Sequence, residues 1–152
     1  MSLTAARTWW LTGLSGAGKS TLARSLATAL RGRQQPVCVI DGDELRAGLC
    51  HDLGFDTASR AENVRRAAHM ARLLNDNGVH AVVALISPDT DARALAYTTI
   101  GRGRCVEVHV NTPLAVCEQR DPKGLYARAR AAQLTVDHVT LAPGRRRAEG
   151  DV

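Results

Sequence analysis

The sequence has few aromatic residues and no long apolar segment, and both shortages exclude classes of protein. Phenylalanine, tryptophan and tyrosine together make up 3% of its 152 residues. Proteins that bind single-stranded nucleic acid stack the bases on aromatic side chains, so this composition argues against a nucleic-acid partner. No apolar run reaches the roughly 20 residues that cross a membrane, and residues 1–9 lack the apolar stretch of a signal peptide. We therefore expect a soluble, cytoplasmic protein without membrane contact.

Cysteine is also scarce, and its four residues are widely separated: Cys38, Cys50, Cys105 and Cys117. No pair has the spacing of a metal-binding motif, and all four lie in or beside apolar segments. We therefore expect buried, reduced thiols rather than metal ligands. Reduced thiols agree with a cytoplasmic location, where disulfides are rare.

Positive charge exceeds negative charge, with 20 Lys and Arg against 15 Asp and Glu, and the formal net charge is +5. A basic balance suits an anionic ligand, but it is equally compatible with simple solubility. Part of the excess lies near the C-terminus, where Arg145, Arg146 and Arg147 are consecutive. We interpret this short basic run as solvated rather than as a nucleic-acid site.

The apolar pattern alternates between short β-branched runs and segments with a helical period. It predicts strands over 8–12, 37–40, 79–86 and 105–110, and helices over 19–31, 43–49, 57–77, 89–100 and 113–119. Thr57 or Ser59 is the expected N-cap of the third of these helices. Strands that alternate with helices form right-handed β-α-β units. We therefore expect a single domain over residues 1–152, of the α/β class, with a parallel sheet and helices on both faces.

Residues 13–20 carry the strongest chemical signal in the sequence. They match the pattern G-x-x-x-x-G-K-[ST] between a predicted strand and a predicted helix. In such a loop the backbone N–H groups and the helix N-terminus bind phosphates, the lysine neutralises them, and the hydroxyl ligates Mg²⁺. The alternative is a glycine-rich turn that matches by accident, but the flanking strand and helix favour the P-loop. The interpretation is a P-loop NTPase-like three-layer sandwich with ATP and Mg²⁺ as cofactors, and the nucleotide-binding residues are Gly13, Leu14, Ser15, Gly16, Ala17, Gly18, Lys19, Ser20 and Thr21.

Three features besides the P-loop indicate which class of nucleotide-dependent enzyme this is: a missing guanine-binding motif, the chain length and two aspartates. The sequence has no Asn-Lys-x-Asp motif, which would read guanine, and a motor or transport ATPase would usually be larger. Asp41 and Asp43 follow the second predicted strand, where ligands bind in parallel sheets. They can hold Mg²⁺-bound water or orient a hydroxyl and take its proton. The alternative is an N-cap beside a turn glycine. A small-molecule kinase is favoured.

Cations follow the aspartates at two places. Arg46 and Arg60 present planar forks that suit phosphate or sulfate oxygens, and Asn63 lies three residues after Arg60, so both can face one ligand. The alternative for each arginine is a solvated helix face. Residues 119–131 combine cations with a turn-forming proline and glycine, which is typical of a mobile lid over the phosphates, or of an exposed basic loop.

Taken together, these stretches resemble adenylyl-sulfate kinase, also called APS kinase. The matching residues cover about 9 to 131 in family order, and they are 10–21, 41–43, 52–55, 60, 62, 63, 65, 66, 86–88, 112–114, 117, 118 and 120–126. The resemblance implies that ATP and adenosine 5′-phosphosulfate (APS) are converted to ADP and 3′-phosphoadenosine 5′-phosphosulfate (PAPS), a step of sulfate assimilation. It also implies a homodimer.

The resemblance implies roles for individual residues. Ser87 matches a serine described in the family as a phosphoserine intermediate, although it could instead hydrogen-bond near the phosphates. The implied catalytic residues are Lys19, Asp41, Asp43 and Ser87; the metal ligands are Ser20 and Asp41; Arg120 joins the nucleotide site; and the acceptor site comprises Asp43, Arg46, Phe55, Arg60, Asn63, Ile86, Ser87 and Lys123.

The sequence departs from the family pattern at three places. Glu44 replaces an asparagine, Asp89 and Thr90 replace Tyr-Arg, and residues 132–152 lack the aromatic residue that stacks on the acceptor's adenine. Such stacking is worth about 1–3 kcal/mol per base. Besides an active APS kinase, a nucleotide-binding pseudo-enzyme and a kinase of another small anionic acceptor are therefore open alternatives.

Overall fold

The computed structural model describes residues 5–87 and 89–130, so the predicted C-terminal tail over 132–152 lies outside the described residues. Four strands form one parallel sheet: β1 (Thr8–Thr12), β2 (Val37–Asp41), β3 (His80–Ala84) and β4 (Cys105–His109). Their order across the sheet is β2-β3-β1-β4. Leu11 and Asp41 both pair with Ala84, so the carboxyl ends of β1 and β2 lie on either side of the end of β3.

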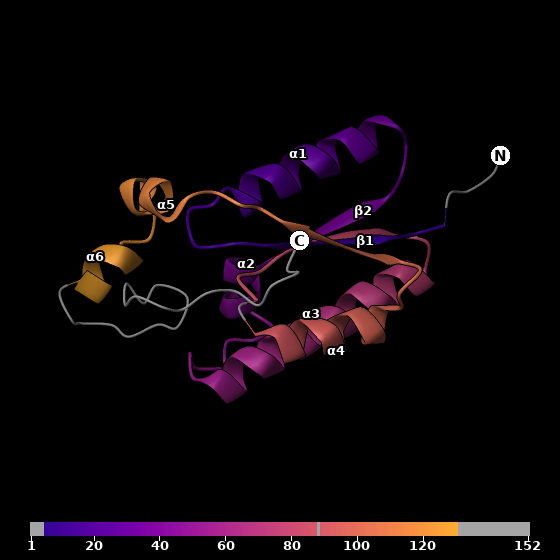
Figure 1. The fold of residues 1–152 in the computed structure, drawn as a ribbon. Coiled ribbons are helices and arrows are strands. Elements are labelled where there is room, and N and C mark those ends of the chain that lie inside the picture. Colours follow the sequence, from indigo (N-terminus) through magenta and orange to yellow (C-terminus); the bar gives the residue numbers. More distant parts are fainter. Residues whose placement is uncertain (1–4, 88, 131–152) are drawn as a thin grey trace.

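Helices cover both faces of this sheet. On one face lies α1 (Lys19–Gly32), and on the other lie α3 (Thr57–Asp76) and α4 (Thr90–Ile100) (Figure 1). The short α2 (Gly42–Ala47) follows β2 directly, and α5 (Leu114–Arg120) and α6 (Leu125–Arg130) lie beyond the carboxyl ends of the strands. The predicted three-layer α/β sandwich with a parallel sheet is confirmed.

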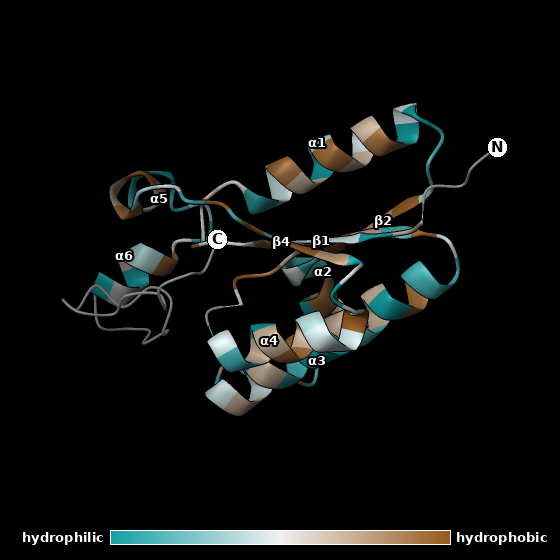
Figure 2. Ribbon diagram, turned by 45° about the vertical axis from the view of Figure 1, so that its right-hand side comes forward, coloured by the Kyte–Doolittle hydropathy of each residue, from teal (hydrophilic) through white to brown (hydrophobic). Residues whose placement is uncertain are grey.

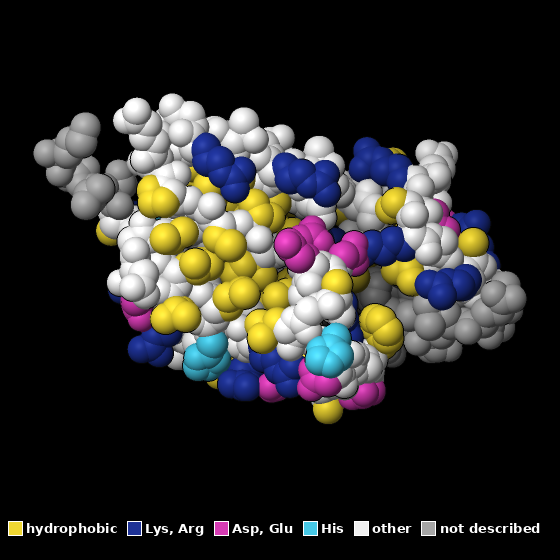
Figure 3. All heavy atoms as spheres, turned by 180° about the vertical axis from the view of Figure 1, so that it is seen from behind, with side chains coloured by type: hydrophobic (Ala, Val, Ile, Leu, Met, Phe, Trp, Pro, Cys, Tyr) yellow, Lys and Arg dark blue, Asp and Glu magenta, His cyan; other side chains and the backbone are white. Residues whose placement is uncertain are grey.

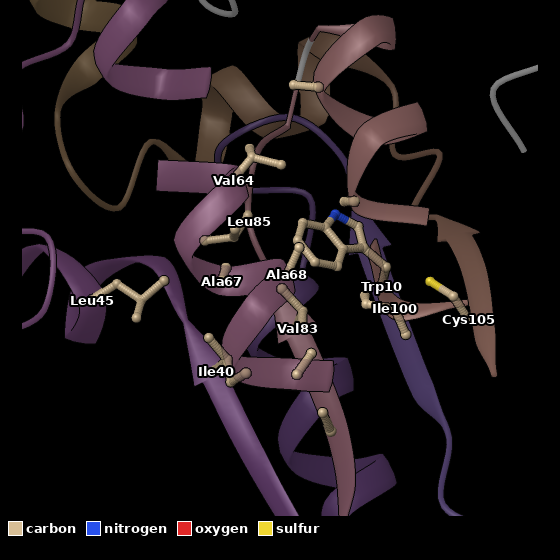
Figure 4. Close-up of a cluster of buried hydrophobic side chains, with 14 of the residues drawn as sticks. Trp10, Ile40, Leu45, Val64, Ala67, Ala68, Val83, Leu85, Ile100 and Cys105 are labelled. Atoms are coloured by element: carbon tan, nitrogen blue, oxygen red, sulfur yellow. The ribbon is translucent and has the colours of Figure 1, made fainter. Parts of the chain in front are cut away.

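The core has two parts because successive side chains of a strand point to opposite faces. Trp10 and Val83 belong to the cluster that packs against α3 and α4 (Figure 4), whereas Leu11 and Val82 belong to the cluster beneath α1. Small residues of α3 that are almost fully buried let this helix approach the sheet closely: Ala67, Ala68 and Ala71. In Figure 2 the strands are coloured mainly as hydrophobic, whereas the helices mix both kinds of residue.

β2 is an edge strand, and its outer side leaves apolar side chains partly exposed. Val37, Cys38 and Val39 are half-buried. Seen from behind, hydrophobic side chains gather there between the two helical layers (Figure 3). All four cysteines are free thiols. The prediction that they are buried is confirmed for Cys50, Cys105 and Cys117 and is wrong for Cys38, which lies on the edge strand.

The structure shifts several predicted boundaries by one or two residues and corrects three predictions in particular. The N-cap of α3 is Asp56, not Thr57 or Ser59, because the Asp56 carboxylate accepts hydrogen bonds from the backbone N–H and the hydroxyl of Ser59. β3 ends at Ala84 rather than at Ile86. The segment after Arg120 was expected to be a loop, but it contains α6. No helix among residues 5–87 and 89–130 is long and apolar enough to cross a membrane.

Candidate active site at the carboxyl ends of the strands

Residues 13–18 form a turn between β1 and α1 in which neighbouring atoms leave no room for a side chain at Gly13 or Gly16. Gly16 has φ 79°, a left-handed conformation, and a Cβ there would come within 3.0 Å of the Cys117 carbonyl oxygen. A Cβ on Gly13 would come within 2.9 Å of the Val110 carbonyl oxygen. Gly18 caps α1 without a side-chain hydrogen bond, so the first N–H groups of α1 lack a side-chain cap. We call this turn the cradle: its glycines and the uncapped N-terminus of α1 suit an anion, and the binding of phosphate there stays a prediction.

Two side chains of α1 lie at this cradle. The Lys19 ammonium donates hydrogen bonds to the carbonyl oxygens of Gly13 and Leu14, at 2.7 and 2.8 Å. The Ser20 hydroxyl donates to Asp41 Oδ2 at 2.5 Å. Asp41 is the last residue of β2 and also the N-cap of α2, because its Oδ1 accepts from the Asp43 backbone N–H. The Asp41 carboxylate therefore caps a helix, which was the structural alternative, and also accepts from Ser20 at the cradle. Its role in holding Mg²⁺ or in taking a proton stays a prediction.

The oxygens of Ser20 and Asp41 fit a magnesium ion. Mg²⁺ prefers oxygen ligands and is usually held by one or two protein groups together with waters and substrate phosphates. Among residues 5–87 and 89–130, no group of three or more His, Cys, Asp or Glu could form a complete protein cage for a metal. A partial site beside a phosphate cradle suits an ion that arrives with a nucleotide.

The predicted lid is packed on the cradle through α5 and α6. The Tyr126 hydroxyl donates to the Ser15 carbonyl oxygen at 2.9 Å, and Arg120 donates to the Gly16 carbonyl oxygen at 3.1 Å. Burial, first among the causes, raises the pKa of the Tyr126 phenol to about 12, so it remains a donor at neutral pH. Lys123 reaches across to Asp43, with 2.7 Å between Nζ and Oδ1. Both lid cations that the sequence singled out, Arg120 and Lys123, therefore lie at the site.

Five of the eight residues expected to bind the acceptor lie on α2, on α3 and on the loop between them, whereas Ile86 and Ser87 follow β3 and Lys123 belongs to the predicted lid. Arg46 donates to the carbonyl oxygens of Leu53 and Gly54, and its guanidinium lies 4.4 Å from the centroid of the exposed Phe55 ring. Arg60 stands in the first turn of α3. Asn63 is 7% exposed, and its buried Oδ1 accepts no hydrogen bond within the described part of the chain. A buried amide oxygen without a donor is unusual, and a ligand donor would satisfy it.

Arg65 and Arg66 form ion pairs with neighbouring carboxylates rather than facing a ligand. Glu62 pairs with both arginines, and Asp52 pairs with Arg66 at 2.7 Å. Hydrogen bonds from these guanidinium groups lower the pKa of Glu62 and of Asp52 to about 2. This ion-pair cluster ties the loop that carries Gly54 and Phe55 to α3, so the arginines support the acceptor side indirectly.

Ser87 lies past the end of β3 in a strained and buried position. Its φ of 45° is left-handed, and the residue is 4% exposed. Its Oγ accepts a hydrogen bond from the Trp10 indole N–H at 3.1 Å. Ile86, beside it, is half-buried. The sequence analysis did not identify this role of Trp10. The strand pattern gives no sign that its indole N–H donates to a residue 77 positions later in the sequence.

Two of the departures from the family pattern have local structural reasons. Asp89 is the N-cap of α4, since its carboxylate accepts from the Asp91 backbone N–H. Glu44 is exposed in the first turn of α2, where a negative charge is favoured by the helix dipole. The third departure, over residues 132–152, lies outside the described residues.

Comparisons with known proteins agree with this geometry. The family model of adenylylsulphate kinase matches residues 5–140. The APS kinase CysC of Mycobacterium tuberculosis, solved in complex with AMPPNP and APS, is 48% identical with a TM-score of 0.82, and the match covers 86% of this chain and 77% of that one. A hexameric APS kinase from Thiobacillus denitrificans is 36% identical with a TM-score of 0.64, covering 74% of this chain and 24% of that one.

More distant likenesses extend to other kinases. A gluconokinase from Sinorhizobium meliloti is 16% identical with a TM-score of 0.58, and the match covers 86% of this chain and 69% of that one. At this identity the likeness shows the fold alone. The fold expected from the sequence, that of a P-loop NTPase, is therefore confirmed by both near and distant structures.

Proposed function

Because this chain belongs to the adenylylsulphate kinase family, a family of kinases, as its motifs predicted, we propose that it transfers the γ-phosphate of ATP to the ribose 3′-hydroxyl of APS. The products are ADP and PAPS. The observation that carries the proposal is the hydrogen bond between Ser20 and Asp41. It joins the phosphate cradle to the loop that begins the acceptor side, so a phosphate donor and a hydroxyl acceptor can meet there.

ATP binds with its phosphates in the cradle over residues 13–18. On binding, the Lys19 ammonium exchanges its two carbonyl partners for the β- and γ-phosphates, and Arg120 adds a second cation from the lid over 119–131. Ser20 and Asp41 would hold Mg²⁺, which would neutralise charge on the phosphates. The M. tuberculosis APS kinase binds AMPPNP, which supports ATP as the donor here.

The proton of the acceptor hydroxyl goes to Asp43. Both oxygens of Asp41 have partners, Ser20 and the backbone N–H of Asp43. The Asp43 carboxylate is exposed and, among residues 5–87 and 89–130, forms one ion pair, with Lys123, so it can turn toward an incoming hydroxyl. The 3′-oxygen forms a bond to the γ-phosphorus while the bond from the γ-phosphorus to the bridging β-oxygen breaks, and ADP leaves. In-line transfer of this kind needs positioning and charge stabilisation, not a covalent intermediate on Ser87.

APS binds between α2, α3 and the end of β3. Arg46 and Arg60 supply cations for the phosphosulfate, and the buried Oδ1 of Asn63 accepts a hydrogen bond from the ligand. Phe55 offers an exposed aromatic face next to Arg46. Ile86 and Ser87 form the wall at the end of β3, and Lys123 closes the site from the lid. The M. tuberculosis enzyme binds APS, which supports this assignment.

The function is tested by ADP release from the purified full chain with Mg·ATP, with and without APS. We expect APS-dependent turnover that Lys19→Ala abolishes, whereas Arg24→Ala, an exposed change on the same helix, leaves it unchanged. ATP binding without turnover would instead identify a pseudo-enzyme. Turnover that another small anionic acceptor supports and APS does not would identify a different kinase. Sedimentation of the same sample tests the implied homodimer.

A further inference from the structure

Arg93 of α4 is a buried cation that no part of the proposed chemistry uses. The residue is 6% exposed, and its guanidinium contacts three separate groups. Nη1 donates to the Ser87 carbonyl oxygen at 2.6 Å, Nη2 donates to the Thr90 hydroxyl at 3.2 Å, and Nε lies 3.2 Å from Glu107 Oε1 on β4. One side chain therefore joins a helix, an edge strand and the segment that leaves β3.

Stability alone does not account for a buried arginine at this place. A buried ion pair loses hydration, and replacing it with apolar residues is often neutral or stabilising. Arginine differs from other residues in its planar fork, which holds several acceptors in fixed directions at once. The geometry of Arg93 is of this kind, because its three nitrogens each have a different partner.

Arg93 contacts the segment of Ile86 and Ser87, where Ser87 has a strained backbone and two hydrogen-bonding partners. Ser87 has a left-handed φ of 45°, a conformation that persists only where the surroundings determine it. Arg93 binds its carbonyl oxygen, and the Trp10 indole N–H binds its hydroxyl oxygen. Trp10 lies in the core between the sheet and α4 (Figure 4). The two contacts leave the Ser87 main chain little freedom to relax.

The same segment borders both halves of the site. β3 lies between β2 and β1, so the chain that leaves it runs between the Asp41 loop and the phosphate cradle. A Cβ added to Gly42 would lie 3.1 Å from the Leu85 side chain, so Leu85, two residues before Ser87, packs closely against the start of α2, which carries Asp43.

We propose that Arg93, oriented by Glu107, is a positioning residue that sets the place of Ile86 and Ser87 and thereby the affinity for the acceptor. The proposal rests on the proposed function. It predicts a selective effect, because Arg93 contacts Ser87, Thr90 and Glu107, whereas the nucleotide cradle follows β1 and is contacted by Lys19.

The first test is the kinetics of Arg93→Lys and Arg93→Met. Lysine keeps the charge but lacks the planar fork, and methionine lacks both. Both variants should therefore raise KM for APS at least fivefold while KM for ATP changes less than twofold. Glu107→Gln should act in the same direction, and the double variant Arg93→Lys/Glu107→Gln should be no worse than the poorer single one. Arg104→Met is the matched control, since Arg104 pairs with Asp76 on the surface, and it should change neither constant.

The second test does not depend on turnover. In a Trp9→Phe background Trp10 is the only tryptophan, and NMR can follow hydrogen exchange of its indole N–H. We expect that Arg93→Lys accelerates this exchange at least tenfold, because Ser87 shifts away, while Arg104→Met does not. If Arg93→Met does not fold, Arg93→Lys still provides the measurement.

The outcomes separate this proposal from the proposed function. Unchanged indole exchange in the Arg93 variants overturns the positioning role, whatever the kinetics. Faster exchange with equal changes in both KM values also overturns it, because Arg93 would then support the fold in general. A wild-type chain without APS turnover overturns the proposed function, and the exchange measurement then decides alone whether Arg93 holds the segment.

Discussion

Lys123 of the lid and Asp43 of α2 form an ion pair with 2.7 Å between Nζ and Oδ1 although 80 residues separate them in the sequence. Both side chains are substantially exposed, at 46% and 68%. The pair joins the predicted lid to the carboxylate that we propose receives the acceptor's proton. Binding of substrate must therefore exchange a lid contact for a contact with the ligand.

Lys123→Met should weaken catalysis more than stability. An exposed ion pair contributes about 0–1 kcal/mol and is screened by salt, so the melting temperature should change by no more than a few degrees. We expect kcat/KM for APS to fall about tenfold or more, since the lid loses its cation. Arg128→Met, an exposed change on α6, is the control. Equal losses in both variants would contradict a specific role for Lys123.

Gly16→Ala should abolish nucleotide binding. Alanine in a left-handed conformation costs about 1–2 kcal/mol, and its Cβ would in addition meet the Cys117 carbonyl oxygen at 3.0 Å. The cradle must shift, so its N–H groups no longer converge on the phosphates. Gly103→Ala is the control, because a Cβ there would meet nothing within 4 Å. Calorimetric titration with Mg·ATP measures both variants, and wild-type affinity in Gly16→Ala would rule out this cradle.

Ser87→Ala should keep measurable turnover and lose stability. Removing the hydroxyl leaves the buried indole N–H of Trp10 without its acceptor, which costs about 1–3 kcal/mol. Urea unfolding measures this loss. Mass spectrometry of the wild-type chain after incubation with Mg·ATP should find no phosphate on Ser87, because its oxygen is buried and already bound. Complete loss of activity together with a phosphorylated Ser87 would support the covalent alternative instead.

Acid should destabilise the chain through the ion-pair cluster of Glu62, Asp52 and Arg66. The arginines lower the folded-state pKa of Glu62 from 4.5 to about 2. A carboxyl with a lowered folded pKa contributes stability above its unfolded pKa and loses it as the pH falls toward the folded value. Stability should thus decrease between about pH 4.5 and pH 2, and Glu62→Gln should flatten this decrease. Glu44→Gln, an exposed change on α2, serves as the control, and chemical unfolding at several pH values is the measurement.

Local patterns predicted most of the elements and the phosphate cradle. The runs that contain Trp10 and Val82 are mostly apolar because a strand inside a parallel sheet is buried on both faces. The cradle was predictable because residues 13–20 act through their own backbone. Local patterns did not predict elements whose formation depends on residues far away in the sequence, such as α6. The Asp121 carboxylate accepts from the backbone N–H groups of Tyr126 and Ala127 in the first turn of α6. The buried Tyr126 in turn donates its hydroxyl hydrogen to the carbonyl oxygen of Ser15, 111 residues earlier in the sequence.

The sequence by itself determined the α/β class, the phosphate cradle and the family, because each depends on residues that are neighbours along the chain or recur at a fixed period. Only the tertiary structure decided which polar groups meet: Ser20 with Asp41, Asp43 with Lys123, and Ser87 with Trp10 and Arg93. Parallel strands bring their carboxyl ends to one edge, but the pairing of side chains there depends on the order β2-β3-β1-β4 and on the turns that follow. Such contacts span 6 to 80 residues, and no local pattern encodes them.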